Sequence, residues 1–501
     1  MSEKPHIIIF NVDQWRGDVL GHLGNPAAET PHLDQLVKDE AVSFSNAFCQ
    51  NPVCTPSRCS FMTGWYPHVR GHRTMYHMLH LNRGEPNLLK ILKDNGYFVW
   101  WGFRNDLISA KDDSKEVCDI QYWPSKEDLA RWGHKWKPNL HTSTRKWRGK
   151  PDSDTYYSFY AGKLDTRGDD IYFDLDWSMI LGVIDFIRNY KGEKPLCIFL
   201  ALANPHPPYG IEEPWFSKIN RNALPPRRKI PQNWAAKPSL LKGIYERQNL
   251  QGWTEDRWNE LRATYYGMCA RLDHQFGLVI EELKRAGYYD DSAIFFFSDH
   301  GDFTGDYGLV EKTQNTFEDC LTNVPFIIKP PKNIPVKPRV CNALVELVDF
   351  SATVYGLTDI DPGYSHFGKS LISLLKGEAK IHRNAVFCEG GRLYGEEQAM
   401  EKEAKSEQKP NGLYWPRVTL QTTDEGPYHG KATMCRTHDF KYVRRLYEQD
   451  ELYDLNKDPE EMNNIIDDPA YNEILSSLKE KLLTWYVETC DVVPFKADNR
   501  F

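Results

Sequence analysis

The sequence lacks any apolar run that approaches the roughly 20 residues needed to span a bilayer. Its first residues, Met1 to Pro5, also lack the charged start, apolar core and small-residue cleavage site of a secretory signal peptide. We therefore expect a protein with no membrane partner, and a cytoplasmic location.

The sequence also lacks regularly spaced cysteines. The 501 residues include 11 cysteines, an odd number without a Cys-x-x-Cys pair, which predicts free thiols in a reducing compartment.

An excess of basic residues is missing too. With 62 Lys and Arg against 70 Asp and Glu, the net charge is -8, which argues against a nucleic-acid partner. An acidic protein that handles an anion must concentrate its positive groups locally. The oligomeric state is not specified.

Several near-continuous apolar runs have the pattern of strands buried on both faces. They are His6 to Val12, Tyr97 to Trp101, Leu196 to Ala203, Ser292 to Ser298 and Val324 to Lys329. Between them lie segments expected to be helical. These are Leu88 to Asp94, Trp177 to Tyr190, Glu255 to Ala286 (one helix or two) and Ala343 to Tyr355. The alternation predicts an α/β fold whose large mixed, mostly parallel sheet is sandwiched by helices.

Near residue 380 the pattern changes to short, alternating segments such as Arg436 to Val443, followed by a helix from Asn472 to Tyr486. We predict a catalytic domain at 1–380 and a smaller α+β domain with an antiparallel sheet at 381–501. A polar insertion at 112–170 and a proline-rich loop at 205–240 are expected to shape a substrate pocket.

The stretch from Pro52 to Gly64 has the signals of a helix start and stop. Cys54 should lie just ahead of the helix N-terminus, where backbone donors favour anions and lower the pKa of a thiol. Arg58 adds a planar donor suited to a tetrahedral oxyanion. The alternative is a buried structural cysteine in an ordinary helix cap.

The run Cys54-Thr55-Pro56-Ser57-Arg58, ending in Thr63-Gly64, resembles the signature of the type I sulfatases of the alkaline phosphatase-like superfamily. In that family a maturase oxidises the cysteine to formylglycine. The resemblance therefore implies that Cys54 becomes the nucleophile precursor and that the generating maturase is a partner.

Asp13 and Asp299 each come at the end of a buried run, and His300 follows directly. Strand ends of a parallel sheet share one rim, so these groups could hold a cation or could simply cap turns. Asn11-Val12-Asp13-Gln14 and Ser298-Asp299-His300-Gly301 resemble the two metal segments of the sulfatases. The resemblance implies that Asp13, Gln14, Asp299, His300 and the residue made from Cys54 bind calcium, with magnesium or manganese as alternatives.

The chain has Gln14 where many family members have a second Asp, and it has His300 where a few members have Asn. Three catalytic cations are implied: Arg58, Lys312 in Gly308-Leu309-Val310-Glu311-Lys312, and His206 in a His-x-Pro-aromatic loop.

Arg104 falls where sulfatases commonly have a lysine, and Asp106 where they have a histidine. Arginine can clamp a sulfate but is a poor acid, so His206 or Lys312 would have to protonate the leaving group. His77 and Asn105 are the predicted substrate contacts.

These features predict a formylglycine-dependent sulfatase acting on a sulfate monoester, with a sulfated carbohydrate as the expected substrate. Positive groups around the ester oxygens would offset the charge of the attacked anion. The alternatives are a phosphonate or phosphate monoester hydrolase of the same superfamily and a non-catalytic metal-binding homologue.

Overall fold

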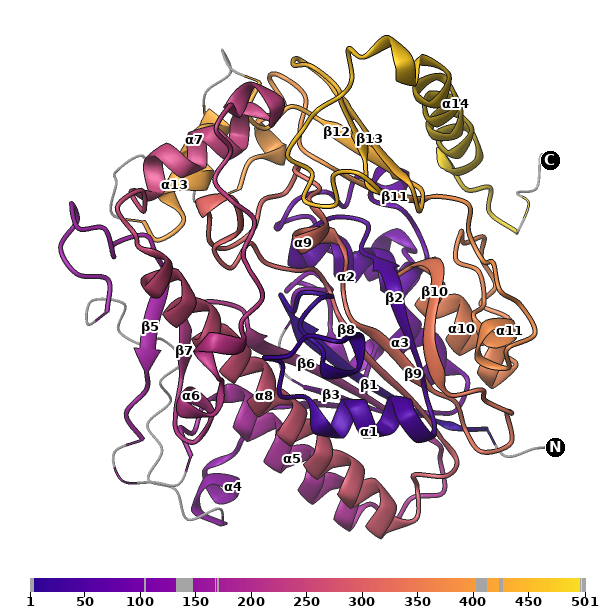
Figure 1. Cartoon of the computed structure of the whole chain (residues 1–501). Helices are drawn as coiled ribbons and strands as arrows, with labels where there is room; N and C mark the ends of the chain where they lie inside the picture. The colour runs from indigo at the N-terminus through magenta and orange to yellow at the C-terminus, as the bar shows by residue number, and fades with distance from the viewer. Residues whose placement is uncertain are drawn as a thin grey trace.

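Strand β1 (His6–Asp13) lies inside an eight-stranded sheet with the order β10-β2-β9-β8-β1-β6-β3-β4 (Figure 1). All neighbours in this sheet are parallel except β9, which runs antiparallel to both β2 and β8. The computed structural model describes residues 4–102, 105–131, 147–166, 168, 171–401, 412–422, 427–495 and 497. The predicted α/β fold with a mixed, mostly parallel sheet is confirmed.

The other strands of this sheet are β2 (Val42–Phe48), β3 (Phe98–Gly102), β4 (Ile120–Tyr122), β6 (Leu196–Pro205), β8 (Ser292–Ser298), β9 (Phe326–Lys329) and β10 (Arg339–Glu346). A two-stranded sheet pairs β5 (Tyr160–Lys163) with β7 (Tyr209–Ile211). The helices are α1 (Pro31–Asp39), α2 (Cys54–Thr63), α3 (Leu88–Asp94), α4 (Lys126–Arg131), α5 (Leu175–Asn189), α6 (Trp215–Lys218), α7 (Ser239–Gln248), α8 (Glu255–Ala286), α9 (Asp319–Thr322), α10 (Asp349–Thr358), α11 (Ile372–Leu375), α13 (Trp415–Val418) and α14 (Asn472–Thr489).

Side-chain alternation along the central strands builds a core on each face of the sheet. In β1, Ile7 and Ile9 pack into one core and Ile8 and Phe10 into the other, as the period of two requires. Helices α2, α3 and α10 cover the first face, and α1, α5 and α8 cover the second (Figure 1). Strands buried on both faces explain the near-continuous apolar runs of the sequence.

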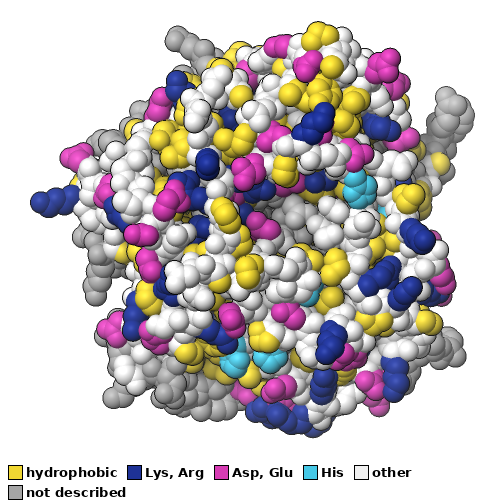
Figure 2. Space-filling view, in the orientation of Figure 1, with side chains coloured by type: hydrophobic (Ala, Val, Ile, Leu, Met, Phe, Trp, Pro, Cys, Tyr) yellow, Lys and Arg dark blue, Asp and Glu magenta, His cyan; other side chains and the backbone are white. Residues whose placement is uncertain are grey.

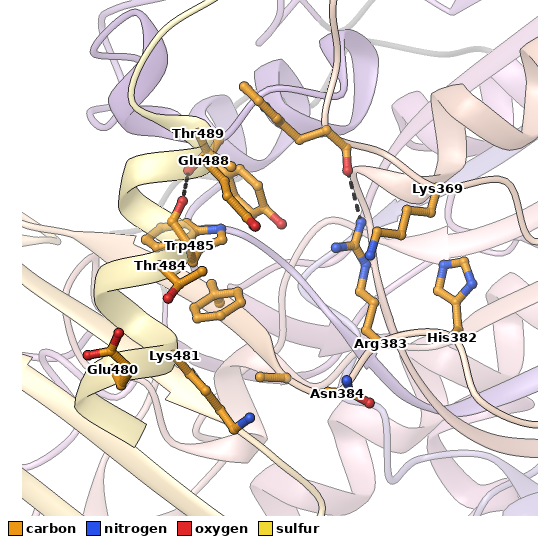
Figure 3. A pocket seen from close by; sticks show the side chains of 14 residues that line it. Lys369, His382, Arg383, Asn384, Glu480, Lys481, Thr484, Trp485, Glu488 and Thr489 are labelled. Atoms are coloured by element: carbon orange, nitrogen blue, oxygen red, sulfur yellow. Dashed lines mark hydrogen bonds between the residues drawn. The ribbon is translucent and has the colours of Figure 1, made fainter. Parts of the chain in front are cut away.

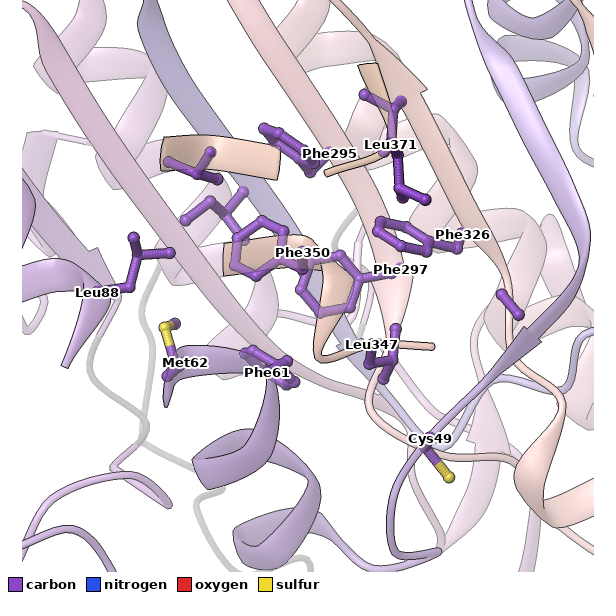
Figure 4. Close-up of a cluster of buried hydrophobic side chains, with 14 of the residues drawn as sticks. Cys49, Phe61, Met62, Leu88, Phe295, Phe297, Phe326, Leu347, Phe350 and Leu371 are labelled. Carbon is purple, nitrogen blue, oxygen red and sulfur yellow. The ribbon is translucent and has the colours of Figure 1, made fainter. Parts of the chain in front are cut away.

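Aromatic side chains fill the core between the sheet and α2 (Figure 4). The ring of Phe297, on β8, lies 5.0 Å from the ring of Phe61 on α2 and 5.0 Å from that of Phe350 on α10. This packing fixes α2, and with it Cys54, against the sheet.

Helix α8 is one continuous helix of 32 residues, which settles the choice between one helix and two. The Thr254 side chain accepts a hydrogen bond from Arg257 N–H at its start, and Gly287, at φ 79°, ends it.

The helix predicted from Ala343 to Tyr355 is wrong over its first part. Residues 343–346 belong to β10, which pairs with β2, and the helix α10 begins only at Asp349. The four side chains from Ala343 to Glu346 are all buried, and periodicity cannot tell such a short run from a buried helix.

Smaller boundary differences follow from turns that the sequence pattern hides. The segment Arg436 to Val443 is not one strand but the end of β12 (Ala432–Arg436), a turn, and most of β13 (Phe440–Arg445). Residues 205–240 contain β7 and α6 instead of being a plain loop, and the described part of 112–170 contains β4, α4 and β5.

The smaller sheet is antiparallel, as predicted, and consists of β11 (Val386–Gly390), β12, β13 and β14 (Glu451–Asp454). Helix α14 packs on it through Leu478, Leu482 and Trp485. The second sheet begins six residues after the predicted boundary at 380; the division into domains stays a prediction.

All 11 cysteines are free thiols in the structure, and only Cys490 is exposed. Among the described helices, none combines the length and the apolarity that crossing a bilayer requires. On the face shown in Figure 2, acidic and basic side chains are interspersed.

Candidate metal centre and active site

Three chain segments bring four ligand-type side chains together. Asp13 is the last residue of β1, and Asp299 and His300 follow β8, which pairs in register with β1 so that Val12 lies beside Ser298. Cys54 is the first residue of α2, one position further inside the helix than the sequence predicted. One ligand atom from each residue lies within 4.8 Å of the others, so the two strand ends and the helix start form one cluster.

The Cys54 sulfur is surrounded by charged and polar groups. Its Sγ lies 3.3 Å from Asp13 Oδ2, 3.3 Å from His300 Nε2 and 3.3 Å from Lys312 Nζ. The residue is 1 % exposed. A buried cysteine in a core contacts apolar side chains; this one faces the polar cluster at the positive end of a helix.

Arg58 bridges the two carboxylates from one helical turn further along α2. Its Nε donates to Asp299 Oδ2 at 2.9 Å and its NH2 group donates to Asp13 Oδ2 at 3.0 Å. All three side chains are buried, so these charge-assisted bonds offset the cost of removing the charges from water. One guanidinium cannot neutralise two carboxylates.

His300 presents Nε2 to the cluster. Its Nδ1 lies 2.9 Å from the carbonyl of Gly301, so the proton of the neutral ring belongs on Nδ1 and the lone pair on Nε2. The pKa of His300 is lowered to about 4, by burial first and also by Lys312, against the opposing effect of Asp299 and Asp13. The ring is therefore neutral at pH 7 and able to bind a metal.

Lys312 and Gln14 connect the cluster to a third buried carboxylate, that of Asp302. Lys312 Nζ donates to Gln14 Oε1 at 2.8 Å, and Gln14 Nε2 donates to Asp302. Burial lowers the pKa of Lys312, but Cys54, Asp13 and Glu311 outweigh it and hold that pKa above its ordinary value. The lysine is charged.

Asp302 itself lies in a dense hydrogen-bond network. The Tyr209 hydroxyl donates to its two oxygens at 2.8 and 2.9 Å, and the Thr304 hydroxyl donates at 2.7 Å. Burial raises the pKa of Asp302 to about 6, although the bonds from Thr304, Tyr209 and Gln14 lower it.

The donor set of the cluster fits a divalent cation. Two carboxylates and an imidazole nitrogen with its lone pair toward the centre are all fully buried around one point, beside the bridging Arg58 and the charged Lys312. Carboxylate oxygens suit calcium, magnesium and manganese, and an imidazole suits a transition metal. Gln14, also predicted as a ligand, has both ends of its amide hydrogen-bonded, to Lys312 and Asp302.

The loop that carries His206 lies beside the cluster, because Pro205 is paired with Asp13. The carboxylate of Asp176 anchors this loop by accepting bonds from Ala203 N–H at 2.7 Å and Asn204 N–H at 2.8 Å. His206 Nδ1 lies 2.7 Å from the carbonyl of Pro207.

The other predicted residues come from the segments around positions 77 and 105. Arg104 lies outside the described residues, whereas Asp106 Oδ2 is 3.9 Å from an Arg58 nitrogen. Asn105 accepts hydrogen bonds from the N–H groups of Leu107 and Ile108 through Oδ1, which shapes its own turn. The half-buried His77 is 2.6 Å from the Thr74 hydroxyl through Nδ1. The pKa of His77 is lowered by burial and by nearby cations.

Sequence reasoning missed several residues beside the cluster. Asp302 stands in the Asp-His-Gly-Asp run, which was the available signal, but it received no role. Tyr209 is the aromatic residue of the His-x-Pro-aromatic loop but received no role of its own. Tyr414 and Arg417 carried no signal, since only folding brings them to Glu311 and Lys312.

A cavity of about 570 Å³ opens elsewhere, between α14 and the chain at 367–387 (Figure 3). Tyr66 lines it, beyond the C-terminal end of α2, whereas Cys54 is at the N-terminal end. A ten-residue helix is about 15 Å long, so this cavity is separate from the cluster.

Comparison with known proteins gives consistent matches. Residues 5–360 match the family model described as Sulfatase, and residues 427–488 match the C-terminal model of N-sulphoglucosamine sulphohydrolase. An ulvan-active sulfatase of Formosa agariphila is 25% identical over 96% of this chain and 80% of its own length. An arylsulfatase of Clostridium perfringens is 24% identical, over 96% of this chain and 94% of its own.

Solved structures share the fold. The phosphonate monoester hydrolase of Agrobacterium radiobacter superposes with a TM-score of 0.70 at 21% identity, covering 97% of this chain and 96% of its own. BT1596, a 2-O GAG sulfatase, superposes with a TM-score of 0.69 at 19% identity, covering 97% and 93%.

Proposed function

We propose, from the premise that this chain belongs to the sulfatase family and is a sulfuric ester hydrolase, that it cleaves a sulfate monoester of a carbohydrate. In this proposal Cys54 is converted to formylglycine and a divalent cation is bound by the cluster around it. The observation that carries the proposal is the meeting of Asp13, Cys54, Asp299 and His300 within 4.8 Å.

Asp13, Asp299 and His300 are the proposed protein ligands of the metal. When bound, the cation would withdraw electron density from a sulfate oxygen and favour the ionised form of the nucleophile. We propose calcium, since two of the ligands are carboxylates; magnesium and manganese are the alternatives. Gln14 is a weaker candidate ligand because its amide is engaged with Lys312 and Asp302.

The modification of Cys54 by a formylglycine-generating maturase is the second part of the proposal. A hydrated aldehyde has two hydroxyl groups. One can attack sulfur and displace the alcohol; loss of a proton from the other then breaks the bond between its carbon and the sulfate oxygen, which expels sulfate and regenerates the aldehyde. A cysteine or a serine has only one nucleophilic atom and no such route. The modified group would stand among Asp13, His300 and Lys312, which contact Sγ now.

Positive charge for the anionic ester comes from this chain's own side chains. Arg58 donates to Asp13 and Asp299, and Lys312 lies 3.3 Å from Sγ. Such fixed charges stabilise the developing oxyanion without reorganisation. We propose that His206 or Lys312 protonates the leaving oxygen, that Arg104 is a further catalytic cation that binds the sulfate, and that His77 and Asn105 contact the substrate.

The proposed carbohydrate rests on the named relatives, one active on ulvan and one described as a 2-O GAG sulfatase. A second candidate reaction is hydrolysis of a phosphonate monoester. The fold shared with the Agrobacterium enzyme favours it, as does Gln14, which leaves the cluster with one less negative charge than a second Asp would. Rates with an aryl sulfate and an aryl phosphonate, measured with metal supplied, would separate the two reactions.

The decisive experiment measures the mass of the peptide that contains Cys54, in protein coexpressed with a maturase. We expect the mass of the aldehyde or its hydrate, together with hydrolysis of sulfated mono- and disaccharides. Cys54→Ser should have no activity, whereas Cys490→Ser, which changes the exposed cysteine, should match the parent protein. Full activity with an unmodified thiol at position 54 would refute the formylglycine mechanism.

A further inference from the structure

Glu311 has a backbone conformation that non-glycine residues rarely adopt. Its φ is 70°, in the left-handed region, and it immediately precedes Lys312. The strained conformation is held at both ends, because Glu311 N–H donates to the Tyr209 hydroxyl at 2.9 Å and its carbonyl accepts from Phe303 N–H at 3.0 Å. Strain of this kind persists where the surrounding structure fixes it, often at functional sites.

The side chain of Glu311 is a buried carboxylate that lacks full pairing. It is 3 % exposed. Its Oε1 lies 3.6 Å from Lys312 Nζ and its Oε2 lies 3.5 Å from Arg417 Nε, and both contacts are ion pairs too long for a good hydrogen bond. Within the described part of the chain, Oε1 accepts no hydrogen bond at all.

Arg417 Nε on the other side is also without a hydrogen-bond partner among the described residues, although the two ends of its guanidinium bind Glu401. The Glu311 carboxylate thus lies between two cations without being tied to either. A buried carboxylate oxygen left without a donor is costly, typically by more than a neutral group in the same position. Such a group is expected to receive a donor from a ligand or a water.

A small pocket is lined by Glu311 and by Lys312, and Lys312 contacts the proposed nucleophile. Glu311, Lys312, Tyr414 and Arg417 line a pocket of about 10 Å³, which is enough for one group the size of a water or a hydroxyl. Lys312 Nζ stands between the carboxylate and Cys54, since it contacts both Glu311 Oε1 and Sγ. A donor bound here would therefore belong to an atom close to the reacting ester.

We propose that Glu311 is a specificity-determining residue whose Oε1 accepts a hydrogen bond from a hydroxyl group of the substrate, on the carbon next to the sulfate ester. The inference rests on the proposed sulfatase function and narrows its substrate class to esters with a free vicinal hydroxyl. An aryl sulfate lacks that donor and leaves the carboxylate unsatisfied.

The charges around Glu311 select a neutral donor. An ammonium group of an amino sugar would be placed beside Lys312 and Arg417, which repel it. A second sulfate or a carboxylate on the same carbon would be repelled by Glu311 and has no proton to donate. A hydroxyl avoids both penalties and is the size of the pocket.

The test begins with the mature wild-type enzyme. Its kcat/KM is measured on the 2-, 3- and 4-monosulfates of methyl galactoside, on the analogues that lack the hydroxyl next to the ester, and on 4-nitrophenyl sulfate. A site built to bind a hydroxyl discriminates strongly against analogues without it. We expect removal of the vicinal hydroxyl to lower kcat/KM by about 10- to 100-fold for the preferred monosulfate, as for a hydrogen bond to a charged group.

The variants Glu311→Gln and Glu311→Asp then assign the effect to this side chain. Glu311→Gln should reduce the ratio of kcat/KM between the hydroxylated substrate and its deoxy analogue toward 1. Most of this change should be a lower kcat/KM for the hydroxylated substrate. Glu311→Asp keeps the negative charge and should retain part of the preference for the hydroxylated substrate over its deoxy analogue. Glu401→Gln removes the other carboxylate on Arg417 and should leave the ratio unchanged.

The possible results separate the inference about Glu311 from the proposed sulfatase function. An unchanged ratio in Glu311→Gln, or equal rates for hydroxylated and deoxy substrates in the wild-type enzyme, would overturn the inference even if every variant folds. Turnover of 4-nitrophenyl sulfate without turnover of any sugar sulfate would overturn it while leaving the sulfatase reaction intact. No turnover of any sulfate ester would overturn the proposed function itself.

Discussion

Gln14 and Lys312, 298 positions apart in the chain, are joined by a 2.8 Å hydrogen bond from Nζ to Oε1. Gln14 is held in the left-handed region, at φ 76°, while its carbonyl accepts a bond from the Tyr265 hydroxyl at 2.7 Å. Because Lys312 also lies 3.3 Å from the Cys54 sulfur, the amide of Gln14 sets the position of a cation beside the proposed nucleophile.

Replacing Gln14 by alanine removes this acceptor and is expected to lower kcat by about 10- to 100-fold, the range for a hydrogen bond to a charged group. The loss should be mainly in kcat, because Lys312 would still be present but less well placed. Gln35→Ala is the matched control, since Gln35 is exposed on α1. Steady-state kinetics that show unchanged kcat in Gln14→Ala would contradict the positioning role.

Removal of the proposed divalent cation should destabilise the protein. A ligand present at 100 times its Kd stabilises the folded state by about 2.7 kcal/mol, so a chelator should lower the thermal unfolding midpoint. Elemental analysis of the purified protein would identify the metal. His300→Ala weakens the cluster and should show a smaller chelator shift than the parent protein, measured by calorimetry. Identical shifts in both proteins would place the metal elsewhere.

The stability of the fold should fall as the pH is lowered, partly through His429. The pKa of His429 is lowered to about 3 in the folded protein, by burial first and also by the nearby Arg417. The unfolded value is about 6.5. Between these values the unfolded state binds the proton preferentially, so the free energy of unfolding decreases as the pH falls below about 6.5.

His429→Gln cannot take up that proton and should lose about 3 kcal/mol less than the parent protein between pH 7 and pH 4. Denaturant unfolding at a series of pH values measures the difference. His438 is exposed, and His438→Gln should follow the parent curve. Parallel curves for His429→Gln and the parent would show that His429 does not titrate as proposed.

Phe350 packs against α2 and the sheet through its contacts with Phe61 and Phe297 (Figure 4). Phe350→Ala leaves a cavity in a core without exposure and should cost about 3–5 kcal/mol of stability. Leu483 on α14 is 58% exposed, so Leu483→Ala should stay within about 0.5 kcal/mol of the parent protein. Denaturant unfolding midpoints for the two variants would test whether Phe350→Ala loses this much unfolding free energy.

The sequence predicted the parts of this molecule that depend on local pattern. Buried strands such as His6 to Val12 and Ser292 to Ser298 are visible because burial on both faces leaves few polar positions. The local pattern of residues 343–346 predicts a helix, which is wrong. Pairing with β2, and not any local preference, makes these residues a strand. Their neighbours on the sheet are distant in the chain, so a short run cannot reveal them.

The sequence by itself determined the sulfatase resemblance, the buried strands and the ligand types Asp13, Cys54, Asp299 and His300, since each depends on residues close together in the chain. Only the tertiary structure decided that Gln14 binds Lys312 and that Glu311 lies between Lys312 and Arg417. These contacts join residues from distant segments. A side chain's partners are fixed by how the sheet and its loops pack, which no single segment specifies.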